Sequence, residues 1–303
     1  MRFKRNLRGE RRFEVAKHAA LHSRGVTLGI ELLSDEDSLG FHFALNLAPR
    51  TISGFCSCPF SFMFRKKLPR DLGTLAKLTI YCLIYVSMNT AQIVGLVRES
   101  SGIGAVITYT QPLLVLCLAS LFLNEKITAN KILGVAVGFT GVVILFLNTA
   151  GSFTLGSSLI MFFAAFLWAV SVIYYKKLLN HVDPFIAVFL QLAIGSVLFT
   201  ALDLGMNSLA FPTNAQYLAI VIYSSAGGLA LGNVFWLHLL RDEEAITLSS
   251  STLLVPAVAL LFGWQFLGEN LNLESLLGSA FTLVGVCLTN LAKNRSRTGS
   301  FLA

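Results

Sequence analysis

The sequence predicts an all-α fold: a polytopic bundle of membrane helices built from two inverted repeats of about five helices each. Composition is the first indication, because 55% of the 303 residues are hydrophobic and 13% are charged, against roughly 25% charged residues in ordinary soluble domains. Long uncharged runs and an internal offset of 144 residues are the other two. A soluble enzyme of this composition could not cover its surface with polar groups, so that class is excluded.

The uncharged runs have the length of membrane helices, which need about 20 predominantly apolar residues to cross the hydrocarbon core. A weaker span covers residues 39–64, where Arg50, Pro49 and Pro59 are unfavourable in lipid. The runs do not alternate in the manner of barrel strands. Eight clear spans are predicted at residues 78–97, 102–123, 130–148, 154–175, 185–206, 215–238, 246–267 and 273–291.

Residues 1–38 form a charged N-terminal segment with eight basic and six acidic residues. The internal offset makes residues 10–31 the counterpart of the span 154–175, yet they carry seven charges. Each central charge costs about 2.5–3.5 kcal/mol in a membrane helix, so we do not expect residues 10–31 to insert. The first helix is therefore predicted to be degenerate or missing. Residues 1–38 are interpreted as a segment not native to the fold or as a surface segment.

The loop charges predict the orientation, since cytoplasmic loops are enriched in lysine and arginine. If the basic tail at residues 294–303 lies in the cytoplasm, the alternating loops place 13 basic residues inside and only Arg98 outside. The sequence therefore predicts a multi-pass protein of the cell membrane with a cytoplasmic C-terminus.

The two halves of the chain are related by an internal repeat. Residues 101–147 match residues 245–291 at 12 of 47 positions without a gap, and the matches pair Pro112 with Pro256, Glu125 with Glu269, Gly134 with Gly278 and Gly141 with Gly285. Five spans separate the copies, an odd number, so the second copy enters the membrane upside down. Inverted repeats are typical of carriers that work by alternating access. We assign residues 39–149 to an incomplete first repeat and residues 153–293 to the second.

Two stretches resemble a known family. The first runs from Thr108-Tyr-Thr-Gln-Pro112 through Leu123-Asn-Glu125 to two glycines, and the second from Leu254-Val-Pro256 through Leu267-Gly-Glu269 to two more. They are similar to the paired signatures of the EamA family in the drug/metabolite transporter superfamily, over about residues 65–293. The resemblance implies ten helices in two inverted repeats and the export or exchange of small metabolites. The missing first helix departs from that pattern.

Polar and aromatic residues inside the spans are the candidate site. Polar side chains in lipid are costly and tend to face the interior of a bundle, and Asn89 and Asn233 occupy matched positions of the repeat. Pro112 and Pro256 interrupt their helices at matched positions, so we interpret them as hinges. The predicted substrate-binding residues are Asn89, Gln92, Tyr109, Trp168, Asn233 and Trp236. Bonds between helices are the alternative role of the same side chains.

The predicted function is transport of a small organic metabolite by alternating access, as efflux or exchange. Neither an enzyme motif nor a metal-ligand pattern is found, and no cofactor, catalytic residue or nucleic-acid partner is predicted. The alternatives are a non-transporting membrane protein, either an intramembrane enzyme or a scaffold, and a channel. Glu125 and Glu269 are expected to cap the helix that follows each of them. The partners are the lipid bilayer and the small-molecule substrate, and a homo-oligomer is compatible with the sequence.

Overall fold

Helices form all the regular structure that the computed structural model describes. It describes residues 71–96, 101–147, 154–205, 230–262 and 272–300, with positions 69, 99, 264 and 265. Seven helices in these ranges are long and apolar enough to cross a membrane, which confirms the predicted all-α membrane bundle. Residues 1–38, the weak span 39–64 and most of the span 215–238 lie outside the described residues.

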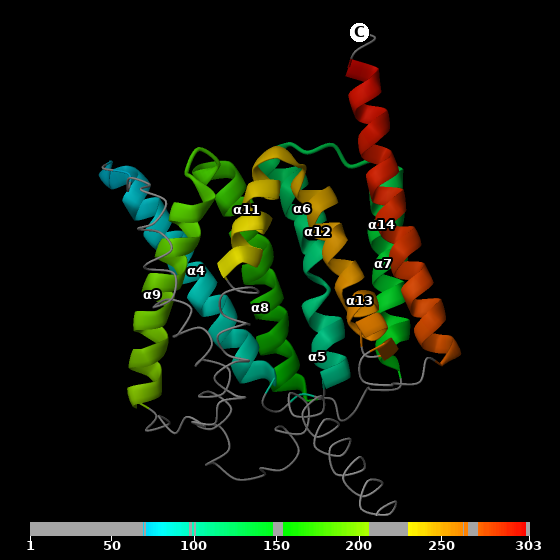
Figure 1. Ribbon diagram of the computed structural model, residues 1–303, viewed down its shortest axis with the longest axis horizontal. Coiled ribbons are helices and arrows are strands. Elements are labelled where there is room, and N and C mark those ends of the chain that lie inside the picture. Colours follow the sequence, from blue (N-terminus) through cyan, green and yellow to red (C-terminus); the bar gives the residue numbers. More distant parts are fainter. Residues whose placement is uncertain are drawn as a thin grey trace, which may run out of the picture.

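Two of the seven spans are composite, each made of two short helices in succession, and the other helices are continuous (Figure 1). The continuous helices are α4 (Leu72–Leu96), α7 (Ala129–Phe146), α8 (Leu155–Tyr174) with its π-helical extension η2 (Tyr175–Leu179), α9 (Pro184–Gly205), α11 (Gly232–Asp242) and α14 (Leu273–Ser300). The composite spans are α5 (Ser101–Thr108) with α6 (Gln111–Leu123), and α12 (Ala245–Ser250) with the 3-10 turn η4 (Ser251–Leu253) and α13 (Leu254–Phe262).

The composite spans are broken at matched positions of the repeat. Proline lacks the N–H that would bond to the carbonyl four residues earlier, which is Thr108 for Pro112 and Thr252 for Pro256. The chain leaves the α-helix at residues 109–110 in the first half and at residues 251–253 in the second. Each break therefore lies beside the carbonyl group that the proline leaves without its helical hydrogen bond.

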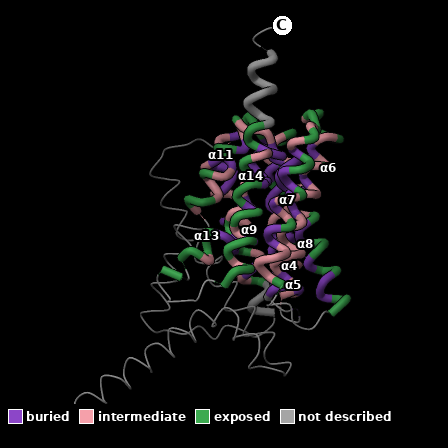
Figure 2. The backbone as a smooth tube through the Cα atoms, turned by 90° about the vertical axis from the view of Figure 1, so that its right-hand side faces the viewer, coloured by how far each residue is buried: buried purple, intermediate pink, exposed green. Residues whose placement is uncertain are grey.

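The helices pack as a bundle whose outer surface is apolar. Figure 1 shows α7 beside α14 at one edge, α4 with α8 and α9 at the other, and α6 with α12 between them. Buried residues line the sides on which the helices meet, and exposed residues cover the outside (Figure 2). Leu121, Val197 and Phe235 are each more than 60% exposed. Apolar side chains in such positions suit contact with lipid tails rather than water.

Glycines allow α7 and α14 to approach closely. An added Cβ at Gly285 would lie 2.3 Å from the Gly138 nitrogen and 2.5 Å from the Gly134 oxygen, and one at Gly141 would lie 2.6 Å from the Gly278 oxygen. Gly134 contacts Gly285, and Gly141, further along α7, contacts Gly278, earlier in α14. The two helices are therefore antiparallel. The offset of 144 residues turns the Gly134–Gly285 contact into the Gly278–Gly141 contact. The contact between the two helices is therefore symmetric under the repeat.

Candidate functional site

The predicted residue Asn233 of α11 is linked to α4 through Tyr85, one turn before the predicted residue Asn89. Asn89 is 3% exposed, and its Nδ2 donates a hydrogen bond to the Tyr85 main-chain oxygen at 2.7 Å. The Tyr85 hydroxyl lies 3.5 Å from Nδ2 of Asn233, its donor on α11. Gln92 is half-buried one turn beyond Asn89. The structure thus links Tyr85 of α4 to Asn233, the residue that the repeat pairs with Asn89.

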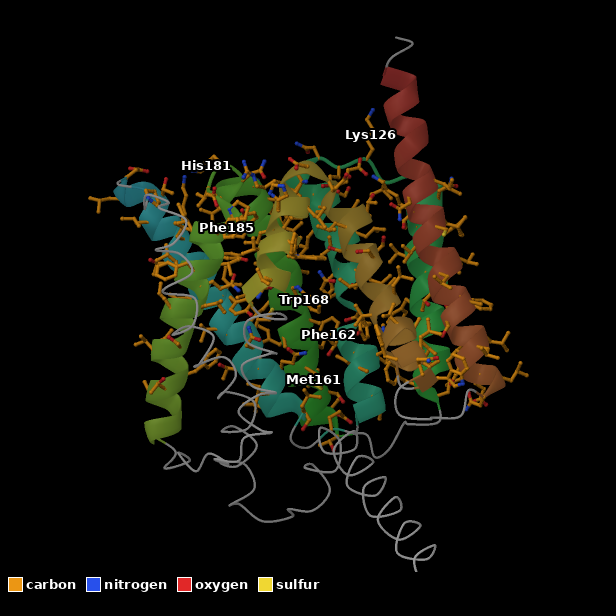
Figure 3. All side chains as sticks on the ribbon, in the orientation of Figure 1. Lys126, Met161, Phe162, Trp168, His181 and Phe185 are labelled. Atoms are coloured by element: carbon orange, nitrogen blue, oxygen red, sulfur yellow. The ribbon has the colours of Figure 1, made fainter. Side chains whose placement is uncertain are left out.

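The predicted aromatic residues fall into two groups. Trp168 of α8 and Trp236 of α11 pack against the same apolar cluster, and Trp168 lies about halfway along the bundle (Figure 3). Tyr109 packs against a different cluster, formed by Val142, Leu253 and Val286. The substrate-binding role of all these residues stays a prediction.

Three further polar side chains in the interior have atoms without a hydrogen-bond partner. Gln111 is fully buried at the first position of α6, just after the break, and neither atom of its amide is bonded. Gln191 Oε1 and Ser249 Oγ are also buried and unbonded. Buried polar groups in proteins are nearly always hydrogen-bonded, so these unbonded atoms are candidate binding groups for water or a polar ligand.

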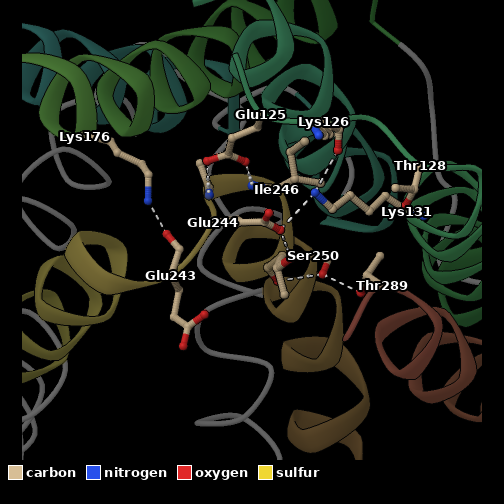
Figure 4. Close-up of polar contacts among 12 residues, drawn as sticks. Glu125, Lys126, Thr128, Lys131, Lys176, Glu243, Glu244, Ile246, Ser250 and Thr289 are labelled. Carbon is tan, nitrogen blue, oxygen red and sulfur yellow. Dashed lines mark hydrogen bonds and ion pairs between the residues drawn. The ribbon is translucent and has the colours of Figure 1, made fainter. Parts of the chain in front are cut away.

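A polar cluster joins the two halves at the end of the bundle where the C-terminus lies (Figures 1 and 4). The Glu125 carboxylate accepts hydrogen bonds from the main-chain N–H groups of Ala245 at 2.7 Å and Ile246 at 3.1 Å. These groups begin α12, so the carboxylate caps that helix and meets its positive end. Asn124 ends α6 in the left-handed conformation, at φ 54°, which asparagine tolerates better than most residues.

Two lysines complete this polar cluster, which we call the clamp: Glu125, Lys131, Lys176, Glu244 and the main chain of residues 240–246. Lys131 is 2% exposed, and its Nζ lies 2.9 Å from Glu244 Oε2 and 2.9 Å from the Lys126 main-chain oxygen. Lys176 Nζ donates to the main-chain oxygens of Leu240, at 3.0 Å, and of Glu243. Figure 4 shows these bonds converging on the start of α12.

The clamp corrects one expectation from the sequence. Glu125 caps α12 of the other half rather than the next helix, α7, which Thr128 caps through a bond to the Lys131 N–H. Glu244, the ion-pair partner of Lys131, was not singled out from the sequence. The available signal was the run Asp242-Glu243-Glu244 beside an otherwise uncharged span. In the structure Glu244 is the member of this run that pairs with Lys131.

These features, broken membrane helices, buried amides and a polar clamp between two halves, define a multi-pass membrane protein of the transporter class. Comparison with known sequences agrees: the EamA-like transporter family matches the chain twice, over residues 40–147 and 155–291. The chain belongs to this family. The family resemblance predicted from the paired motifs is thereby confirmed.

Relatives with similar sequences are named as transporters in several organisms. An uncharacterized transporter from the sor 3' region of Acidianus ambivalens is 27% identical, over 82% of this chain and 93% of that protein. The uncharacterized transporter YvbV of Bacillus subtilis is 30% identical, over 66% of each chain. A chloroplastic WAT1-related protein of Arabidopsis thaliana is 27% identical, over 82% of this chain and 62% of that one.

A solved structure supports the fold. One crystal structure, of a protein 16% identical to this chain, matches it with a TM-score of 0.74 and covers 89% of this chain and 92% of that one. At this level of identity the likeness concerns the architecture alone.

Proposed function

We propose that this protein carries small uncharged or zwitterionic metabolites across the cell membrane by alternating access, as an exporter or exchanger. The proposed arrangement has two inverted halves and a cytoplasmic C-terminus. One central site between the halves then opens to one side of the membrane at a time.

The observation that carries the proposal is the clamp. It bonds the α6–α7 connection, which belongs to the first repeat, to the start of α12 in the second. Contacts between the halves at one end close that end, and a carrier must break them to expose its site there. With the C-terminus in the cytoplasm, the clamp holds the cytoplasmic end shut in this conformation.

The breaks at the two prolines and the glycine contact between α7 and α14 support the inverted arrangement. The breaks occupy positions that the repeat matches, and the glycine contact is antiparallel and maps onto itself under the offset. Broken helices inside a membrane bundle are tolerated where they face protein or a water-filled space. In carriers such broken helices commonly form the substrate site.

The chemistry of the interior favours a substrate without net charge. The described residues near the middle of the spans offer amides, hydroxyls and indoles, such as Asn89, Asn233 and Trp168. The buried charged side chains among the described residues are Glu99, which bonds to Ser158 near the start of α8, and Lys131, which pairs with Glu244 in the clamp. A phosphorylated sugar would require a fixed positive charge beside it, so we expect such compounds to be poor substrates.

Transport in sealed proteoliposomes tests the proposal. The full chain is screened against neutral and zwitterionic metabolites, with sugar phosphates as the charged contrast. Asn89→Leu should reduce uptake of the best substrate at least tenfold, because it removes the amide from the buried face of α4. Ser87→Leu is the matched control, since it adds the same side chain to the exposed face of that helix and should leave uptake unchanged. Normal transport by Asn89→Leu would refute the site, and transport of none of the compounds would refute the function.

A further inference from the structure

A glutamine side chain is enclosed in the interior at the break between α5 and α6. Gln111 is 0% exposed, and neither Nε2 nor Oε1 of its amide has a hydrogen-bond partner among the described residues. It is the tenth residue of the 22-residue span Gly102–Leu123, so it lies near the middle of the membrane. A buried amide without a partner is destabilising. The fold therefore bears a cost at this position.

The two threonines of the break are bonded within their own stretch of chain. The hydroxyl of Thr108 donates to the Gly104 main-chain oxygen at 2.9 Å, and that of Thr110 donates to the Ile107 main-chain oxygen at 2.6 Å. Such local bonds satisfy a hydroxyl group without a partner from another helix. Gln111, the next residue along the chain, has no such bond in the described structure.

The amide lies on the stripe of α6 that faces the interior. Gln111, Val115 and Ala119 follow one another at intervals of four residues and are all 0% exposed, so they share one face of the helix. Val115 and Ala119 belong to the apolar cluster against which Trp168 and Trp236 pack. Gln111 therefore lies one helical turn from Val115, on the face of α6 that contacts the cluster holding both predicted indoles.

The repeat shows that the helix break does not require a polar residue here. The offset of 144 residues pairs Gln111 with Val255, and each residue directly precedes the proline of its half. Val255 is 54% exposed on α13, whereas Pro112 and Pro256 are both buried. The second half thus builds the same break with an apolar residue at this position. The break therefore does not account for the amide of Gln111.

We propose that Gln111 binds the substrate through its amide, and that the matching group on the substrate is an uncharged carboxamide or lactam. The glutamine amide presents a donor, the Nε2–H group, beside an acceptor, Oε1. A carboxamide or lactam presents an acceptor beside a donor in one plane, so two parallel hydrogen bonds form. The inference rests on the proposed function, because Gln111 is enclosed in this conformation and the substrate reaches it only when the bundle opens.

Other polar groups match this amide less well. A carboxylate has acceptors only, so it bonds to Nε2 and faces the partial negative charge of Oε1. An ammonium group has donors only and meets the opposite conflict at Nε2. A single hydroxyl oxygen meets both atoms only with strongly bent bonds, which are weak. Glutamine pairs in the same bidentate manner with adenine, whose edge also places a donor beside an acceptor.

Binding of nicotinamide to the full chain in lipid nanodiscs tests the site without transport. Nicotinamide should bind at least about tenfold more tightly than two analogues on the same ring. The analogues are nicotinate, which carries a carboxylate, and N,N-dimethylnicotinamide, which lacks the donor. Gln111→Met should weaken nicotinamide binding and erase the difference between the three compounds. No nicotinamide binding by wild type, or equal binding of the three compounds, overturns the proposal.

Cys117→Met is the matched control, because it places the same side chain on the exposed face of α6. It should bind nicotinamide as wild type does. Methionine is unbranched, as glutamine is, and adapts to irregular space in a protein interior. Gln111→Met should therefore raise the unfolding temperature of the ligand-free protein, since it removes an unbonded polar group. A lower unfolding temperature, or binding that survives the substitution, overturns the proposal.

Transport in proteoliposomes separates this inference from the proposed function. Wild type should equilibrate labelled nicotinamide faster than vesicles without protein, and Gln111→Met should lose this difference. Binding of nicotinamide without transport refutes the carrier function and leaves the site in place. Transport of other neutral metabolites, with no binding of nicotinamide, refutes the site and leaves the carrier function standing.

Discussion

The glycine contact between α7 and α14 yields a quantitative prediction about stability. Replacing Gly285 by alanine places a Cβ 2.3 Å from the Gly138 nitrogen, whereas ordinary van der Waals contact begins at 3.4 Å. The neighbouring atoms are backbone, which cannot rotate away as a side chain can. The two helices must therefore separate locally by roughly 1 Å, which weakens the dispersion contacts along the seam by a quarter to a half.

The expected magnitude follows from two opposing effects. Overpacking a tight interior costs about 1–3 kcal/mol, and the rigid partner puts Gly285→Ala near the upper value. Alanine is favoured over glycine in a helix by about 1 kcal/mol, which reduces the net loss to about 2 kcal/mol. Gly195→Ala is the matched control in the middle of α9, where the nearest atom to the new Cβ lies at 3.7 Å. Gly195→Ala should gain about 1 kcal/mol.

The assay is equilibrium unfolding in mixed detergent micelles, followed by circular dichroism, for both variants and wild type. The helix-propensity effect is common to both variants and cancels in their difference, so that difference should be about 3 kcal/mol. Equal stabilities for the two variants would refute the close approach of α7 and α14 on which the prediction depends.

Three further predictions concern the clamp, a hinge and a helix start. Lys131→Met should lengthen the distance between spin labels at positions 126 and 242, because it breaks the ion pair with Glu244. Lys177→Met, at an exposed lysine of the same end, is the control and should leave this distance unchanged. An unaltered distance in both variants would argue against a gate. Pro112→Ala should slow transport severalfold without lowering stability, since alanine restores the helical N–H, and full activity would contradict the hinge. The Thr74 N–H donates a hydrogen bond to the Asp71 carboxylate and holds the pKa of that group below its ordinary value of 3.8. Amide-exchange protection at the start of α4 should therefore persist above pH 3.8 and disappear as the pH falls through the lowered pKa. Protection that is the same at every pH would refute the capping.

Much of the fold was predictable because the membrane imposes simple rules. Apolar runs of helical length locate the spans, and a proline inside a span removes one specific hydrogen bond, so the breaks before Pro112 and Pro256 follow from composition and position. Glycines at helical spacing favour close helix contact, and Gly134, Gly138 and Gly141 of α7 make such a contact with α14. The family also follows from the sequence, since its paired motifs are local and regularly spaced.

The sequence by itself determined the helices, their breaks and the membership of a transporter family, because each depends on neighbours along one stretch of chain. Only the tertiary structure decided which partners meet. It turned Glu125 toward α12 of the other half, paired Lys131 with Glu244 and enclosed Glu99 beside Ser158. These contacts join residues 59 to 120 positions apart, and their geometry depends on how whole helices pack, which no local pattern of residues encodes.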